Sequence, residues 1–237
     1  MPQKQKIIIF DTGPIISLTL NNLLWMLDKL KEKFHGEFYI TPAVYDELIN
    51  KPLSTRKYKL EALQVLPYIT KGTLKVYNNL PIIEIGKQIE EYANHSFEME
   101  NNFVQIVHRG EIEAVATAIS LQADAIGIDE RTTRHLIEKP EKIAQHMENT
   151  IHKKVLINWK NIEALKQLFG QLKVIRSVEL ITIAYELGLF NDYLLNAKTN
   201  AVPNVKRAVL EGALWGVKLN GCSVKEEEIE DILKMEK

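Results

Sequence analysis

The sequence predicts an α/β fold with a mostly parallel sheet, and three observations support this prediction. Short apolar runs typical of buried strands alternate with segments whose apolar residues keep a helical period. Acidic residues directly follow two of these runs, at Asp11 and Asp129. The chain of 237 residues is 46% hydrophobic and 26% charged, so it can bury a sizeable core. Alternating strands and helices are typical of parallel sheets.

Residues 6–50 predict two strand–helix units. The first strand is expected at residues 6–10, which are rich in β-branched Ile. The turn at residues 12–14 leads into one helix, whose apolar positions are Ile16, Leu20, Leu23, Leu24 and Leu27. Residues 38–41 predict the second strand. Thr41 is the expected N-cap of the next helix, with Pro42 at its first position.

The pattern from residue 51 onward predicts further helices and strands, and the whole chain is expected to divide into three regions. Leu60, Leu63 and Leu66 suggest a helix, residues 74–77 a strand and residues 82–95 another helix. The strongest segment is the helix at 111–122 followed by the strand at 125–128. We expect a core of residues 1–138, an inserted helical hairpin at 139–173, and a last part at 174–237. This last part holds the final strand and a helical tail, with Gly188 and Gly221 at helix ends and Ser223 at an N-cap.

Four acids are the candidate site residues: Asp11, Glu47, Glu111 and Asp129. Each is expected where a strand ends or a helix begins, and the carboxyl ends of parallel strands line one rim of the sheet. Carboxylates that meet there repel one another unless a cation lies among them. Oxygen ligands suit a hard cation, so Mg²⁺ or Mn²⁺ is the expected cofactor.

Simpler interpretations of these acids remain open at this point. Asp11 can serve as a helix cap, and Glu111 can complement a helix dipole. Glu113 is expected to be a solvated residue on a polar stripe of its helix. Asp46 and Glu47 point about 100° apart, so only one of them can face a shared ion comfortably, and physical reasoning leaves the two nearly even.

Composition and motifs exclude several classes of protein. The single cysteine, Cys222, rules out an internal disulfide and a thiolate zinc site, and it fits a reducing cytoplasm. Apolar runs are too short to span a bilayer, so no membrane association is expected, and the first residues do not resemble a signal peptide. The histidines show no zinc-ligand spacing, and neither glycine-rich nucleotide-binding motif occurs. The net charge of −1 gives no basic excess.

The chain resembles PIN-domain proteins at residues 7–12, 40–48, 110–118 and 128–131. The resemblance is greatest to the branch with a Gly-Glu-x-Glu-Ala helix and a helical C-terminal tail, which includes toxin-like ribonucleases. It implies a three-layer α/β/α sandwich in which Asp11, Glu47, Glu111 and Asp129 bind one or two divalent cations and support RNA hydrolysis. The choice of Glu47 over Asp46 rests on this resemblance.

The resemblance also suggests substrate contacts and partners. Arg131 and Arg134 are expected to hold the RNA backbone, because guanidinium pairs well with phosphate, and Thr12 is expected to orient a carboxylate or water. A small antitoxin protein and a second copy of the chain are implied partners. Two features depart from the family pattern: the insertion at 139–173, and Arg176-Ser177 in place of a glycine-containing turn.

The leading hypothesis is therefore a cytoplasmic, metal-dependent ribonuclease, which the resemblance makes a toxin of the toxin–antitoxin type. The alternative is a non-catalytic PIN-like module that binds RNA or protein. An aspartyl-phosphate phosphatase ranks far behind both, because Gly13 stands where such enzymes need a second carboxylate.

Overall fold

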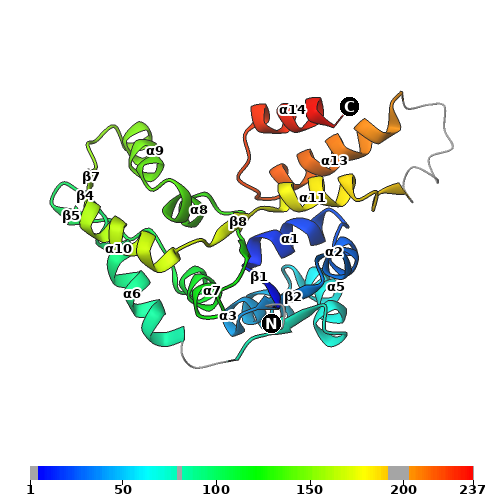
Figure 1. The fold of residues 1–237 in the computed structure, drawn as a ribbon, viewed down its shortest axis with the longest axis horizontal. Helices are drawn as coiled ribbons and strands as arrows, with labels where there is room; N and C mark the ends of the chain where they lie inside the picture. The colour runs from blue at the N-terminus through cyan, green and yellow to red at the C-terminus, as the bar shows by residue number, and fades with distance from the viewer. Residues whose placement is uncertain (1–4, 79–81, 192–202, 237) are drawn as a thin grey trace.

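A five-stranded parallel sheet forms the centre of the molecule (Figure 1). The computed structural model describes residues 5–78, 82–191 and 203–236. The strand order is β3-β2-β1-β6-β8, and every pairing in this sheet is parallel. The strands are β1 (Lys6–Phe10), β2 (Gly36–Ile40), β3 (Leu74–Val76), β6 (Ala125–Gly127) and β8 (Lys173–Ile175). The predicted α/β class with a mostly parallel sheet is confirmed.

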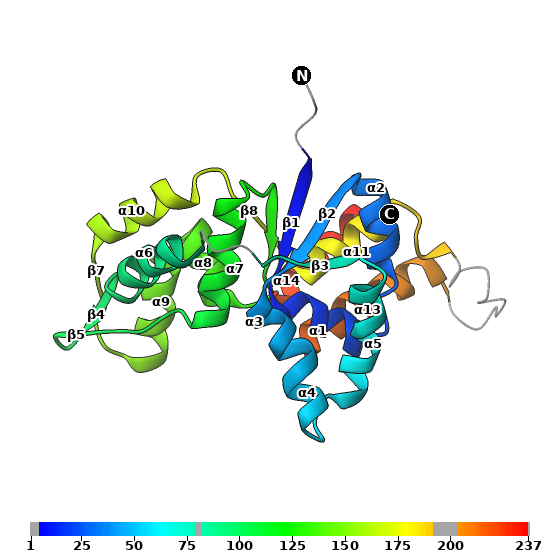
Figure 2. The same cartoon turned by 90° about the horizontal axis from the view of Figure 1, so that it is seen from below.

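Helices cover both faces of the sheet and give the predicted three layers (Figure 2). On one side lie α1 (Thr12–Leu20), α2 (Met26–Phe34), α5 (Lys59–Thr70), α11 (Ser177–Glu186), α13 (Val205–Leu219) and α14 (Glu226–Met235). On the other lie α6 (Ile82–Asn94), α7 (Arg109–Ser120), α8 (Arg131–Glu138), α9 (Glu141–Ile151) and α10 (Trp159–Phe169). Strand β1 shows why: Ile8 and Phe10 pack into the first core and Ile9 into the second, because successive side chains alternate.

The helix expected to run through Leu27 is two helices, and this part of the prediction is wrong. Asn22 adopts a left-handed backbone conformation with φ of 55°, which ends the first helix. Leu23 and Leu24 lie in the connection and are still buried in the core. Hydrophobic periodicity alone therefore misses the break, because the buried positions continue across it.

The segment 139–173 carries more than a helical hairpin. Strand β7 (Leu156–Ile157) lies between α9 and α10 and pairs antiparallel with β4 (Phe97–Met99). Strand β4 also pairs with β5 (Asn102–Phe103), so a small second sheet joins this segment to the end of α6. The pairing of β4 with β5 is a local hairpin, whereas the pairing of β4 with β7 joins residues far apart in the sequence, such as Phe97 and Ile157, so no local pattern predicts it.

The C-terminal tail returns to the edge of the central sheet. Gly188 and Gly221 have φ of 72° and 113° and lie at helix ends, as predicted. Ser223 was predicted to be the N-cap of the last helix, and this prediction is wrong. Helix α14 begins at Glu226, and its N-cap residue is Lys225. The backbone N–H of Ser223 donates to the Asp129 carbonyl at 2.9 Å. Among the described residues, no helix is long and apolar enough to cross a membrane.

Candidate functional site

Asp11 lies at the carboxyl end of β1 and is 9% exposed. It is the N-cap residue of α1, but its side chain forms no regular capping hydrogen bond. Burial raises the pKa of Asp11 to about 7, and repulsion from Glu111 and Glu47 adds to this effect. The backbone N–H groups of Thr12 and Gly13 offset part of the rise. The structure thus brings three of the predicted acids within electrostatic reach of one another.

Glu47 belongs to a π-helical turn at Asp46–Asn50, between α3 (Pro42–Tyr45) and α4 (Lys51–Ser54). The hydroxyl of Thr12 donates to Glu47 Oε2 at 2.8 Å. A Cβ atom on Gly110 would lie 3.4 Å from Glu47 Oε1, which places this carboxylate beside the start of α7. Asp46 instead accepts from the Asn50 side chain at 3.1 Å. Of the two neighbouring acids, Glu47 is therefore the one directed toward the cluster.

Glu111 occupies the third position of α7 and combines two roles that the sequence left as alternatives. Its Oε2 accepts from the His108 N–H at 2.8 Å, which closes the N-terminus of the helix. Burial raises the pKa of Glu111, and the nearby carboxylates of Glu130 and Glu47 also contribute. Because the carboxylate is partly buried among other acids, capping alone does not account for its position.

Glu130 is a member of this acidic group that sequence reasoning missed. Its carboxylate accepts from the Thr132 and Thr133 N–H groups at 2.6 and 2.7 Å and so caps α8. It also lies near enough to Glu111 to raise the pKa of that residue. The available sequence signal was an acidic residue directly before a helix. It predicts that Glu130 caps α8, but it does not predict that Glu130 lies near Glu111.

Asp129 has a different environment from the other acids. It is 1% exposed and accepts from Ser17 Oγ at 2.6 Å, Ser177 N at 2.7 Å and Ser177 Oγ at 2.8 Å. Three of roughly four lone-pair positions on the carboxylate are therefore used. The thiol of Cys222 lies beside it, and burial, followed by the charge of Asp129, raises the thiol pKa to about 12. Asp129 thus joins α1, the end of β6 and α11.

The two arginines expected to bind substrate contact the C-terminal tail. Arg131 is exposed and donates from Nε to Ser223 Oγ at 3.1 Å. Arg134 donates from Nη2 to the Ser223 carbonyl at 3.4 Å, and its side chain is only 13% exposed. Of the two, Arg131 is the one whose side chain is accessible.

The donor set suits a hard cation, but it does not form a closed cage. Within residues 5–78, 82–191 and 203–236, no three His, Cys, Asp or Glu side chains are close enough to hold one metal ion together. The acids near Asp11 supply only oxygen donors, and burial, with a smaller contribution from their repulsion, raises the pKa of the Asp11 carboxyl group to about 7. Mg²⁺ commonly binds one or two carboxylates and completes its shell with water and substrate phosphate. These acids fit that kind of binding.

Comparison with known families agrees with this arrangement. A family model described as a PIN domain matches residues 7–141, which is more than half of the chain. The chain belongs to the PIN-domain family, whose members are generally metal-dependent nucleases. The matched region contains β1 and β6 and all four predicted acids. Comparison with curated proteins gave no match.

Replacing Thr12 by valine tests how Glu47 is held. The change removes the donor to Glu47 Oε2 at nearly constant volume. Loss of an interaction that orients a metal-binding carboxylate typically costs about 10–100-fold in affinity or activity. We expect the Mn²⁺ concentration for half-maximal stabilisation in thermal melts to rise by about tenfold or more. Thr12→Ser should restore it, and an unchanged Mn²⁺ requirement in Thr12→Val would contradict this role.

Proposed function

We propose that this chain is a metal-dependent ribonuclease that hydrolyses phosphodiester bonds through Asp11, Glu47 and Glu111. The observation that carries the proposal is the buried Asp11 carboxyl group. Its pKa is raised to about 7 beside two further carboxylates, at the carboxyl rim of a parallel sheet. A buried acid without a side-chain cap is costly, and a bound cation would remove that cost.

The chain's own residues would position the reacting groups. One or two carboxylates of the group Asp11, Glu47 and Glu111 would bind Mg²⁺ or Mn²⁺, with water and substrate phosphate completing the shell. When bound, such a cation lowers the pKa of water and neutralises phosphate charge. The Thr12 hydroxyl fixes Glu47, and the His108 N–H fixes Glu111. Asp129 is the fourth acid of the proposed site. Its three hydrogen bonds favour a role in setting the position of Asp11 through the end of β6.

RNA is the substrate that we propose, with Arg131 as a contact to its phosphates. The guanidinium of Arg131 is exposed and two residues from Asp129. Arg134 remains a weaker candidate, since the Ser223 carbonyl already engages it. A small antitoxin and a second copy of this chain remain predicted partners, and the toxin role and the cytoplasmic location also remain predictions.

Cleavage of a mixed single-stranded and structured RNA pool tests the function. Wild type should cut with Mn²⁺ or Mg²⁺, and EDTA should stop the reaction. Asp11→Asn should lose cleavage by a factor of at least about 100, because the first carboxylate of the cluster is gone. Asp46→Asn is the matched control, since Asp46 faces Asn50 instead of the cluster. Cleavage that survives both EDTA and Asp11→Asn would refute the proposal.

A non-catalytic RNA- or protein-binding module is the second candidate function. It is favoured by the finding that no three metal-ligating side chains converge among the described residues. This candidate predicts that Mn²⁺ causes no shift in the thermal melting of the wild type and that no RNA is cut. A Mn²⁺-induced shift that Asp11→Asn abolishes would instead support the ribonuclease.

A further inference from the structure

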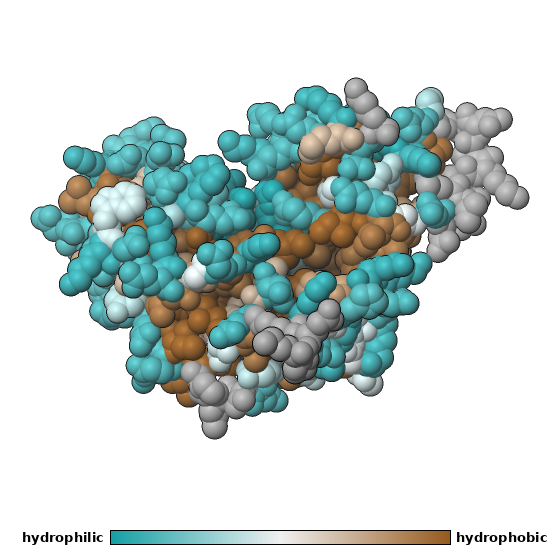
Figure 3. All heavy atoms as spheres, in the orientation of Figure 1, coloured by the Kyte–Doolittle hydropathy of each residue, from teal (hydrophilic) through white to brown (hydrophobic). Residues whose placement is uncertain are grey.

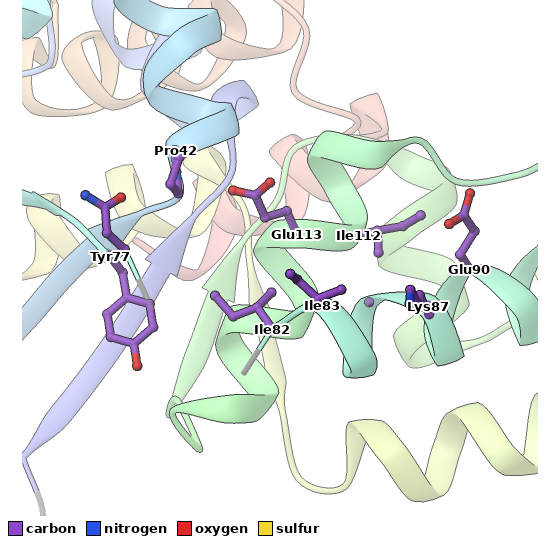
Figure 4. A pocket seen from close by; sticks show the side chains of 10 residues that line it. Pro42, Tyr77, Ile82, Ile83, Lys87, Glu90, Ile112 and Glu113 are labelled. Atoms are coloured by element: carbon purple, nitrogen blue, oxygen red, sulfur yellow. The ribbon is translucent and has the colours of Figure 1, made fainter. Parts of the chain in front are cut away.

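A pocket with mostly apolar walls opens beside the acidic cluster, and neither the fold nor the proposed chemistry accounts for it. It has a volume of about 540 Å³ and lies between the ends of β2 and β3 and the helices α6 and α7. Figure 4 shows its side chains: Glu113 lies between Pro42 on one side and Ile82 and Ile83 on the other, with Tyr77 farther away. Ile83 is 58% exposed, and Figure 3 shows a hydrophobic area over the start of α6. Apolar walls around a few polar groups are typical of ligand sites.

The pocket is close to the acids because α3 and α7 pack side by side. The Ala43 N–H at the start of α3 donates to Glu113 Oε1 at 3.1 Å. Four residues further along, Glu47 lies beside Gly110 at the start of α7. This step corresponds to about 6 Å along the helical segment. A molecule in the pocket would therefore sit about one helical turn from the acidic cluster.

Glu113 is the polar group best placed to select a ligand. The sequence predicted a solvated residue, and that prediction is wrong: Glu113 is half-buried and its Oε1 is fixed by the Ala43 N–H. A carboxylate only accepts hydrogen bonds, so the remaining acceptor positions favour ligands that present N–H groups. Adenine, cytosine and guanine carry an exocyclic amino group, whereas uracil offers only its ring N3–H, which lies between two carbonyl oxygens that a carboxylate repels. Unpaired bases in single-stranded RNA offer these edges to proteins.

Gly86 supplies a second, independent observation about the pocket. It lies within α6, where glycine is a poor helix former, and it lines the pocket wall. A Cβ atom at this position would contact only Ile112 Cγ2, at 3.4 Å. Tight packing therefore does not require glycine here, and a large side chain would fill the space. Lys87 is exposed at the pocket and can meet a phosphate.

We propose that this pocket binds one base of single-stranded RNA and that Glu113 favours bases with an amino group over uracil. The proposal rests on the ribonuclease function only for its choice of RNA as ligand. The walls supply apolar contact, Glu113 accepts from the base, and the neighbouring acids face the adjoining phosphate. Ligand binding and phosphodiester cleavage are separate properties of this arrangement and can be measured separately.

Binding is measured first, with the Asp11→Asn chain so that no RNA is cut. Fluorescence anisotropy compares short labelled oligo(A), oligo(C) and oligo(U). We expect oligo(U) to bind about three- to tenfold more weakly than oligo(C), because uracil replaces the amino-group hydrogen bond to Glu113 by a less favourable one. Gly86→Leu should weaken binding of all three and remove the preference, whereas Gly86→Ala, the matched control, should keep it.

Glu113→Gln keeps an oxygen acceptor for Ala43 and adds an N–H donor, so it should narrow the difference between oligo(C) and oligo(U). Glu163→Gln on the exposed face of α10 should leave that difference unchanged. A base preference that is identical in the Asp11→Asn chain with and without Gly86→Leu or Glu113→Gln would overturn the pocket proposal, even if the wild type cuts RNA. If base preference responds to these variants but no RNA is ever cut, the pocket proposal stands and the ribonuclease fails.

Discussion

Asp11→Asn is expected to abolish RNA cleavage while making the metal-free protein more stable at pH 8. The reason is that the pKa of Asp11 is raised by burial to about 7, from 3.8 for an unperturbed carboxyl group. The unfolded chain therefore releases this proton near pH 4, whereas the folded chain holds it to about pH 7. The stabilising contribution is complete below the unfolded pKa and is lost as the pH rises through the folded pKa.

The size of this effect has an upper limit of about 4 kcal/mol, the free energy that corresponds to the pKa difference of Asp11. Asparagine has nearly the same shape as aspartate, and its side chain does not titrate. The Asp11→Asn protein should therefore lack this part of the pH dependence of stability. Urea unfolding in EDTA at pH 5 and pH 8 measures the part that is lost between these two pH values, which is at most about 3 kcal/mol. Wild type should lose stability between the two pH values, and Asp11→Asn should lose much less.

Cation binding gives the matching test of the same carboxylate. A cation competes with the proton on Asp11, so Mn²⁺ affinity should rise with pH up to about pH 7. Mn²⁺ should raise the melting temperature of wild type and of the control Asp46→Asn, but not of Asp11→Asn. If Asp11→Asn were less stable than wild type at pH 8 in EDTA, Asp11 would be a structural cap instead.

The parts of the fold that the sequence could predict are those governed by local pattern. Buried strands such as β1 and the helical period of α7 depend on nearby residues, and both lie where expected. The acids at strand ends followed from the same pattern, because parallel strands place their carboxyl ends together. Asp11, Glu47 and Glu111 do come within electrostatic reach of one another.

The rest depends on contacts that no local pattern contains. The choice between Asp46 and Glu47 depends on how their helical segment packs: Glu47 accepts from Thr12, whereas Asp46 accepts from Asn50. The contacts of Arg131 and Arg134 with Ser223 cross 92 and 89 residues of sequence. Glu113 looked solvated on a helical projection because the projection does not show that α3 packs on that side.

The contrast between Asp11 and Asp129 shows how one residue type takes two roles at the same rim. Both are buried at the end of a strand, with exposures of 9% and 1%. Asp129 has three hydrogen bonds from Ser17 and Ser177, so its buried charge is compensated by the protein. The Thr12 and Gly13 N–H groups compensate Asp11 only in part, and two like charges lie nearby, so the rest of the compensation is left to a proton or a cation. The two residues should therefore respond to substitution in opposite ways.

Asp129→Ala is accordingly expected to destabilise the protein by about 3–5 kcal/mol, whether or not a cation is present. Alanine removes the acceptor for the Ser177 N–H and for two hydroxyl groups in a region that is closed to water. Ser17 can turn partly toward the Asn220 carbonyl, 3.5 Å away, but the Ser177 N–H has no such alternative in its hydrogen-bond pattern. Urea unfolding measures the loss.

Asp129→Asn separates the structural role from a direct role in binding the cation. Its amide oxygen can still accept from the Ser177 N–H, and the serine hydroxyls can reorient toward the amide group. We expect a loss of only about 1–2 kcal/mol and retention of the Mn²⁺-induced shift in melting. If Asp129→Asn were as stable as wild type but lost the Mn²⁺ shift and all cleavage, Asp129 would itself be a cation ligand. Asp11 and Asp129 would then both bind the cation, instead of Asp11 binding it and Asp129 holding the surrounding backbone in place.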